Sequence, residues 1–195
     1  MGMREGRRHR YEGVSVQDVV FLTRLMVILG VKKFIITHAV GALVPDYKPM
    51  DIVVVTDQIG LDCDDPTGGS ELIESPLNKK PVTFSLVCAF NSRFAQIAEE
   101  CAGSAGVVLK RNGVSIFKKG RAYETAAEGR AMAILGGTVA TMSTIPEIMA
   151  LSQMGIGMEE GSGVLDLALV TDMVANVRKA EEGHVSQCEV DTVAE

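Results

Sequence analysis

The chain has 195 residues, of which 47% are hydrophobic, and it carries a formal net charge of −6. This length is enough for one sizeable core, so we expect a single domain over residues 1–195. The hydrophobic content excludes an intrinsically disordered chain, and the negative charge argues against a nucleic-acid partner. The apolar stretches are interrupted by polar residues well short of a membrane span, so no membrane partner is expected.

The cysteines and the N-terminus indicate the cellular compartment. Cys63, Cys88, Cys101 and Cys188 lie far apart and form no CxxC pair and no metal-ligand spacing. We interpret them as reduced thiols, two of them in the core. The N-terminus lacks the apolar region of a signal peptide. Together these features predict a cytoplasmic protein.

The first half of the chain predicts one helix and two strands. Ser15 precedes a periodic apolar run that ends at a glycine, which is typical of a capped helix over residues 15–29. Residues 33–37 and 52–56 are short apolar runs, the pattern of strands in a sheet covered on both faces. Residues 57–80 are rich in Gly, Asp, Pro and Ser and predict a long loop.

The second half continues the alternation of helices and strands. Residues 81–101 have apolar residues at helical spacing. The apolar runs on either side of Asn112 and Gly113 favour a β-hairpin. Residues 164–170 predict another strand, and the polar segment 175–195 a C-terminal helix. The order of elements indicates the α/β class, with a mixed, largely parallel sheet flanked by helices.

The segment 121–147 carries strong local signals. Thr125, followed three residues later by Glu128, forms a capping box that begins a helix. A short apolar strand then leads to Ser143 and Thr144 at the start of a further helix. Hydroxyl groups beside free helix N–H groups can bind an anion. Helix capping explains the same pattern, so the residues alone leave both interpretations open.

Polar residues follow the predicted strands at their carboxyl ends, where ligands bind in open α/β sheets. They are Thr37-His38, Thr56-Asp57, Met142-Ser143 and Thr171-Asp172. We therefore expect a ligand site at this edge of the sheet.

Against the acidic balance of the whole chain, the N-terminal segment is basic. Its cationic residues are Arg4, Arg7, Arg8, His9 and Arg10. Such a cluster either binds a small anion or is a solvated tail.

Motifs between residues 6 and 172 match one family in order. Residues 6–13 read GRRHRYEG, 37–43 read THAVGAL, and 51–61 read DIVVVTDQIGL. Further motifs are Tyr123-Glu124-Thr125 with Glu128 and Arg130, Met142-Ser143-Thr144 with Pro146-Glu147, and Val170-Thr171-Asp172. The first three resemble the G-R-x-H-x-Y-E-G, T-N-A-A-G-G-L and G-D-I-x-x-I-x-D-H-I-N-L motifs of the trimeric purine nucleoside phosphorylases, and the others resemble that family's remaining motifs.

The resemblance implies phosphate-dependent cleavage of the N-glycosidic bond of purine (deoxy)ribonucleosides, giving free base and ribose 1-phosphate in purine salvage. The transition state resembles a ribosyl oxocarbenium ion, so the protein must hold phosphate near C1′ and donate hydrogen bonds to the leaving base. Inorganic phosphate is then a co-substrate, and no metal or other cofactor is called for. The resemblance also implies a homo-oligomer, a trimer or a multiple of it.

For the phosphate, the resemblance implies four contacts: Arg7, His9, the backbone N–H of Ala39 and the hydroxyl of Ser143. A forked guanidinium suits phosphate oxygens better than a point charge does. The other arginines of the basic segment remain as solvated charges in this interpretation, Arg4, Arg8 and Arg10.

For the nucleoside, the resemblance places Tyr11 at the ribose 3′-hydroxyl, Met142 against the sugar and Tyr123 over the base. Glu124 holds the N1–H edge of the purine. The remaining nucleoside-binding residues are Thr171, Asp172 and His184, the last at the 5′-hydroxyl, and the residues assigned to catalysis are Glu124, Asp172 and His9. Without the resemblance, the preferred interpretation is that Tyr123 is a core aromatic and Glu124 a charge at a helix N-terminus.

Departures from the family pattern affect both ends of the site. Asp172 stands where the family usually has Asn, whereas the sister methylthioadenosine phosphorylases carry Asp. A carboxylate accepts a hydrogen bond from a 6-amino group, so Asp172 favours adenine nucleosides. Glu124 favours the opposite preference, because those relatives lack it. Base preference stays open. His38 replaces the Asn of the turn motif, and Ala42 replaces a Gly.

Only five residues precede the motif that begins at Gly6. The resemblance therefore implies a phosphorylase-type sheet that lacks the family's first strands and its phosphate loop. Such a sheet would expose an unpaired apolar edge unless another chain covers it. Two functions follow: an active phosphorylase, or a catalytically impaired family member that acts as a binding or oligomer partner.

Overall fold

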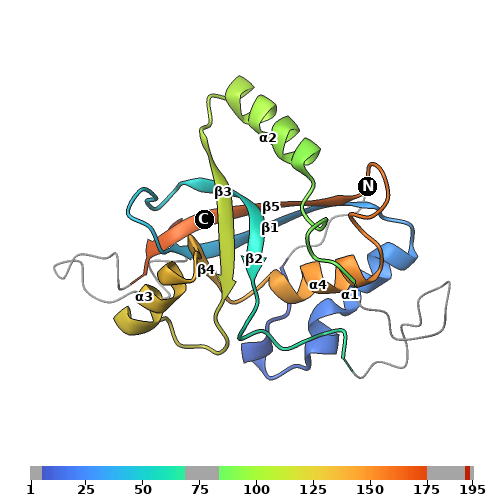
Figure 1. Cartoon of the computed structure of the whole chain (residues 1–195), viewed down its shortest axis with the longest axis horizontal. Helices are drawn as coiled ribbons and strands as arrows, with labels where there is room; N and C mark the ends of the chain where they lie inside the picture. Colours follow the sequence, from blue (N-terminus) through green and yellow to red (C-terminus); the bar gives the residue numbers. More distant parts are fainter. Residues whose placement is uncertain (1–5, 69–83, 175–191, 194–195) are drawn as a thin grey trace.

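The computed structural model describes residues 6–68, 84–174 and 192–193. Their elements form a mixed α/β fold (Figure 1). In chain order they are η1 (Arg10–Glu12), α1 (Val16–Ile28), β1 (Lys33–Ala42), β2 (Ile52–Ile59), α2 (Ser92–Ser104), β3 (Leu109–Phe117), α3 (Ala126–Ile134), β4 (Val139–Thr141), α4 (Ile145–Gln153) and β5 (Gly163–Met173).

The five strands close on one another in the order β1-β4-β3-β2-β5. The pairs β1/β5, β2/β3 and β3/β4 are parallel, and β1/β4 and β2/β5 are antiparallel. The predicted mixed, largely parallel sheet is therefore confirmed. Every described strand has two neighbouring strands, so none is a free edge along its whole length. Parts of the strands are paired on one side alone, among them residues 33–40 of β1 and 109–114 of β3.

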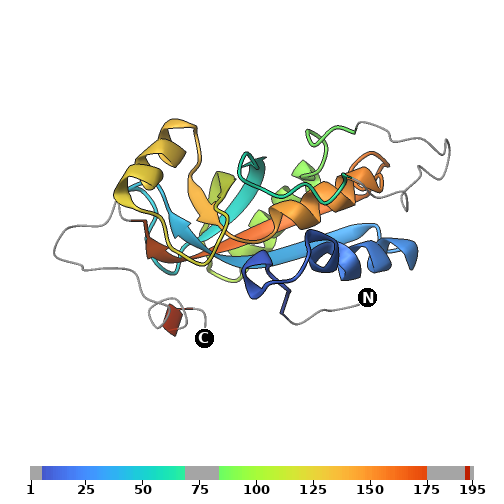
Figure 2. The same cartoon turned by 90° about the horizontal axis from the view of Figure 1, so that it is seen from below.

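Helices α1 and α4 pack against each other at one end of the sheet, and α3 lies at the other end (Figure 2). Two of these helices begin at the predicted caps. The hydroxyl of Ser15 accepts from the Asp18 N–H at 3.1 Å, and the hydroxyl of Thr125 accepts from the Glu128 N–H at 3.2 Å. In both, the acidic side chain returns a bond to the cap, which completes the capping box.

The core follows from alternation along β1, whose inward side chains begin at Phe34 and Ile36 and end at Ala42. One apolar cluster lies between the start of β1 and α4, and it includes Phe34, Ile148 and Leu151. A second cluster fills the interior of the closed sheet, with Val40, Val53, Val55, Val139, Ala168 and Val170. His38 also occupies an inward position, so its ring lies in the protein interior.

The predicted hairpin at Asn112 and Gly113 is wrong. Residues 109–117 form one strand, β3, which runs parallel to both β2 and β4. Asn112 adopts φ 57°, and the register with β2 shifts at this point, so the dipeptide makes a bulge. Gly113 is required because a Cβ there would lie 2.5 Å from Val53 Cγ1.

Other boundaries also differ from the predictions. The helix expected over residues 81–101 begins only at Ser92, where the Asn91 side chain caps it. The predicted loop 57–80 starts later, because β2 continues to Ile59, and most of its remainder lies outside the described residues. The C-terminal helix expected over 175–195 lies almost wholly outside them. The sequence predicted a sheet covered on both faces. In the structure, the outward-facing side chains in the first part of β1 are exposed instead.

The described cysteines lie outside the core. Cys88 and Cys101 are exposed and Cys63 is half-buried, so the prediction of two core cysteines is wrong; Cys188 lies outside the described residues. Burial, followed by the charge of Asp64, raises the pKa of the Cys63 thiol to about 12.

In the part of the chain that is described, every helix is too short or too polar to cross a membrane.

Candidate functional site

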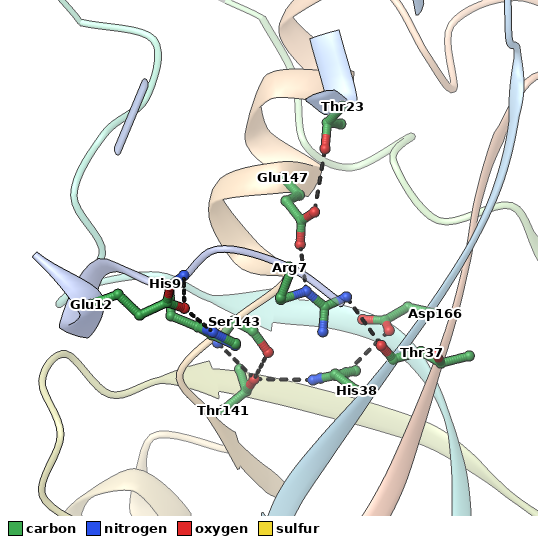
Figure 3. Close-up of polar contacts among 10 residues, drawn as sticks. All are labelled: Arg7, His9, Glu12, Thr23, Thr37, His38, Thr141, Ser143, Glu147 and Asp166. Carbon is green, nitrogen blue, oxygen red and sulfur yellow. Dashed lines mark hydrogen bonds and ion pairs between the residues drawn. The ribbon is translucent and has the colours of Figure 1, made fainter. Parts of the chain in front are cut away.

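Arg7 links the N-terminal segment to the start of α4 and to β1 (Figure 3). Its Nε donates to Glu147 Oε2 at 3.1 Å, and its Nη2 donates to the Thr37 carbonyl at 3.0 Å. Glu147 is buried in the first turn of α4 and also accepts from the Thr23 hydroxyl of α1 at 3.3 Å. These bonds fix the plane of the guanidinium and leave further N–H donors for an anion.

His9 lies two residues further along the same segment. Its backbone N–H donates to Glu12 Oε1 at 2.7 Å, and its Nδ1 lies 3.0 Å from the same oxygen. The ring stacks on Tyr11 with centroids 4.6 Å apart. Burial raises the pKa of the Tyr11 phenol, the charge of Glu12 adds to this rise, and Arg7 and Arg121 oppose it.

The turn between β4 and α4 has an unusual backbone. Thr144 adopts φ 47° and ψ −46°, and the Ile145 N–H donates to the Ser143 carbonyl at 2.6 Å. A positive φ is costly for a β-branched residue and such strain is concentrated at functional sites. Thr144 makes no side-chain cap, so the capping interpretation is wrong for this helix. The Ser143 hydroxyl instead lies 3.3 Å from the hydroxyl of Thr141.

Behind this turn lies a buried pair of ionisable side chains. His38 Nε2 is 3.1 Å from Asp166 Oδ1, and their side chains are 1% and 0% exposed. The opposite ring nitrogen, Nδ1, is 3.0 Å from the hydroxyl of Thr141. The start of α4, the end of β4 and the middle of β1 and β5 therefore share one polar cluster.

A second polar group lies at the carboxyl ends of β1 and β5, where Asp172 pairs with Gly41. The Thr171 hydroxyl donates to Asp172 Oδ1 at 2.9 Å. Burial and then the nearby charge of Asp172 raise the pKa of Glu124, with backbone bonding and Lys118 opposing the rise. Glu124 and Asp172 are thus two neighbouring carboxyl groups, and the pKa of Glu124 is raised above its usual value.

Comparison with known proteins identifies the family. A model of the phosphorylase superfamily matches residues 4–194. This chain belongs to the phosphorylase superfamily. It is 33% identical over 174 residues to purine nucleoside phosphorylase 1 of Geobacillus stearothermophilus, covering 89% of this chain and 59% of that protein.

Solved superfamily structures agree with the fold. The purine nucleoside phosphorylase of Schistosoma mansoni in complex with inosine gives a TM-score of 0.82 at 28% identity, covering 97% of this chain and 64% of that one. The same organism's enzyme in complex with adenosine gives 0.81 at 28% identity, covering 96% and 65%. This superfamily member therefore spans 59% to 65% of the length of these relatives.

The remaining predicted site residues lie on several elements and differ in burial. Tyr123 and Met142 are half-buried, and Tyr123 comes just before α3. Ala39 is exposed on β1. Thr171 is buried and its hydroxyl also reaches the Val40 carbonyl at 3.3 Å. His184 lies outside the described residues.

Arg10 was predicted to be a solvated charge. This prediction is wrong, because the Nε of Arg10 donates to Asp64 Oδ2 at 2.6 Å. Lys119 binds the other oxygen of Asp64 at 2.5 Å. The N-terminal segment is therefore tied to the loops after β2 and β3. Arg8 is exposed, as expected of a solvated charge, and Arg4 lies outside the described residues.

Three site residues were missed by sequence reasoning: Glu147 as the partner of Arg7, Thr141 and Asp166. Glu147 stood inside a recognised motif, which was the available signal. Asp166 gave a weaker signal, an acidic residue at the centre of an otherwise apolar strand, which needs a partner when buried. No group of three or more His, Cys, Asp or Glu side chains suited to a metal ion occurs among the described residues.

Proposed function

We propose that this protein cleaves the N-glycosidic bond of purine (deoxy)ribonucleosides with inorganic phosphate, releasing the base and ribose 1-phosphate in purine salvage. One observation carries the proposal: Arg7 and the start of α4, 140 residues apart in the chain, are joined beside Ser143. Membership of the superfamily and the purine nucleoside phosphorylase relatives support it. Phosphate is the co-substrate, and no cofactor is proposed.

In this proposal, the free N–H groups of Arg7, the His9 ring, the Ser143 hydroxyl and the Ala39 N–H hold phosphate against the ribose C1′ carbon. The phosphate oxygen forms the new bond to C1′ as the bond to the purine nitrogen breaks. Charge on phosphate stabilises the ribosyl cation, and positioning supplies most of the rate enhancement. Tyr11, Met142 and His184 hold the sugar.

At the purine end, Tyr123 covers the base, and Glu124, Asp172 and Thr171 contact its edge. The ionised form of Glu124 accepts from the N1–H of a 6-oxopurine. Its neutral form donates, while Asp172 accepts from the amino group of a 6-aminopurine. Relatives are known with inosine and with adenosine bound. We therefore propose both nucleoside classes as substrates, including methylthioadenosine.

The test is base release from inosine, adenosine and methylthioadenosine, each with and without phosphate. Phosphate-dependent release of base from at least one of them is the expected result. Asp172→Asn should shift the ratio of kcat/KM towards inosine by about tenfold or more, because an amide can donate to a 6-oxo group. The absence of phosphate-dependent release from all three nucleosides would refute the proposal.

A second candidate function has its own observation. The His9 ring at the phosphate end already has a carboxylate partner, because its Nδ1 lies 3.0 Å from Glu12 Oε1. This pairing favours a catalytically impaired member that acts as a binding or oligomer partner. Ordinary turnover by the purified chain would exclude it. In either case we propose a cytoplasmic homo-oligomer, a trimer or a multiple of it.

A further inference from the structure

Four side chains from three different segments form one continuous polar row behind the phosphate end (Figure 3). The row runs from Asp166 on β5 to His38 on β1, then to Thr141 at the end of β4 and to Ser143 in the turn that follows. Asp166, His38 and Thr141 are buried, whereas Ser143 is half-buried. Ser143, at the outer end of the row, is therefore the only one of the four side chains that a ligand can reach.

The inner end of the row is a charge pair. The 3.1 Å approach of His38 Nε2 to Asp166 Oδ1 does not follow hydrogen-bond geometry, and neither Asp166 oxygen has a hydrogen-bond partner among the described residues. A carboxylate buried without bonds needs a compensating charge. The imidazole of His38 is the group that meets it, and an imidazolium would supply this charge.

An imidazolium at His38 decides which hydrogen bonds the Thr141 hydroxyl accepts and which one it donates. A threonine hydroxyl has one donor and two acceptor positions. Its oxygen accepts from the Ser143 backbone N–H at 3.2 Å. It also accepts from His38 Nδ1 when the ring is an imidazolium. Both acceptor positions are filled, so the Thr141 proton goes to Ser143 Oγ, and the Ser143 proton points outward.

We propose that Asp166, His38 and Thr141 are positioning residues that hold the Ser143 hydroxyl as an outward hydrogen-bond donor to phosphate. The inference rests on the proposed function, in which Ser143 contacts phosphate. With a neutral ring whose Nδ1 accepts, the row reverses: Thr141 donates to the ring, Ser143 donates to Thr141, and Ser143 presents only lone pairs to the anion. The buried carboxylate selects the first direction.

Thr141→Val removes the central hydroxyl and keeps the shape of the side chain. We expect it to raise the KM for phosphate about tenfold or more, the scale of a hydrogen bond to a charged group, and to leave the KM for nucleoside unchanged. Thr141→Ser should restore the phosphate KM. The control is Ser115→Ala, which removes a hydroxyl buried on the neighbouring strand β3 outside the row.

Asp166→Asn is the second variant, because it keeps the shape and removes the charge that selects the imidazolium. It should raise the phosphate KM in the same way. The rise in melting temperature caused by inorganic phosphate gives a readout that does not depend on turnover, and it also confirms that each variant folds.

The outcomes are distinct. Phosphate binding that is weakened in Thr141→Val and Asp166→Asn but not in Ser115→Ala supports the row, even if the protein cleaves no nucleoside and the proposed function fails. Phosphate binding that is equal in all variants overturns it. Equal losses for phosphate and nucleoside, or no phosphate binding by the unmodified protein, overturn it as well.

Discussion

Glu124 and Glu128 are four residues apart, and their carboxyl groups respond to their surroundings in opposite directions. Burial and the charge of Asp172 raise the pKa of Glu124. Hydrogen bonds from Lys118 and from Thr125 lower the pKa of Glu128 to about 2. The first residue belongs to the purine end of the proposed site and the second to the cap of α3. One short segment thus contains a carboxyl group that opposes folding when ionised and another that favours folding when ionised.

This contrast predicts opposite effects of two matched substitutions. Glu124 lowers the free energy of unfolding as pH rises through its raised pKa, so Glu124→Gln should stabilise the protein at pH 7. The gain should disappear below the unfolded value of 4.5. Glu128→Gln should destabilise it at pH 7, an effect that is lost as pH falls from 4.5 towards 2.

Urea unfolding of both variants at pH 7, pH 4 and pH 2 measures these differences, since the Glu128 effect is lost only between pH 4.5 and about 2. The two substitutions serve as controls for each other, since both replace a glutamate by its amide at the start of α3. A shift of the same sign in both variants at pH 7 would contradict the argument.

At the scale of the elements, β3 depends on the bulge at Asn112 and Gly113. Gly113→Ala places a Cβ 2.5 Å from Val53 Cγ1 and 3.2 Å from the Val54 carbonyl. The expected loss is about 1–3 kcal/mol of unfolding free energy, the usual cost of overpacking. Gly103→Ala is the control: it lies in α2 with nothing within 4 Å, and should gain about 0.5 kcal/mol.

Chemical denaturation of both variants tests this prediction. If Gly113→Ala were as stable as the unmodified chain, Asn112 and Gly113 would lie in a backbone with room for a side chain, as in a terminal turn, and not in a bulge packed against β2.

The same element shows which features can be read from sequence. The caps at Ser15 and Thr125 were predicted correctly because a cap is a contact between residues three apart. The Asn112-Gly113 dipeptide has the same left-handed preference in a hairpin and in a bulge, so only the partner strands decide between them. Those partners come from distant segments, and no local pattern identifies them.

The same distinction between local patterns and contacts of distant segments applies to the candidate site. Arg7, Ser143 and Glu124 were assigned to the site because they belong to motifs that resemble a family, and their roles stay predictions. Asp166 was missed because its role depends on His38, which approaches it only when β1 and β5 pair side by side. His184 stays a prediction, since it lies outside the described residues.

At the scale of the whole molecule, α1 presents an apolar face to its surroundings. Phe21 is 60% exposed and Ile28 is 73% exposed; the same helix also exposes Leu22 and Leu25, and Leu29 directly after it is exposed as well. Contiguous exposed apolar side chains of this kind mark protein contacts. They fit the proposed homo-oligomer.

Phe21→Glu combined with Ile28→Glu should therefore shift the protein to a smaller assembly, because burying two carboxylates in an apolar contact is unfavourable. Light scattering after size-exclusion chromatography measures the mass. Leu61→Glu is the control, at an exposed position outside α1. Unchanged mass in the double variant would show that this face is not the contact.

Helix α2 contributes no buried side chain to the molecule. It projects from the sheet in Figure 1. Asn91 attaches it: the side chain caps the helix and donates to the Ser162 carbonyl at 2.8 Å, and the backbone N–H donates to Val164. Because neither polar end of the proposed site lies in this helix, its outer face is a suitable place for a fluorescent label or an affinity tag. A reporter there would follow assembly or ligand binding without altering the residues that perform them.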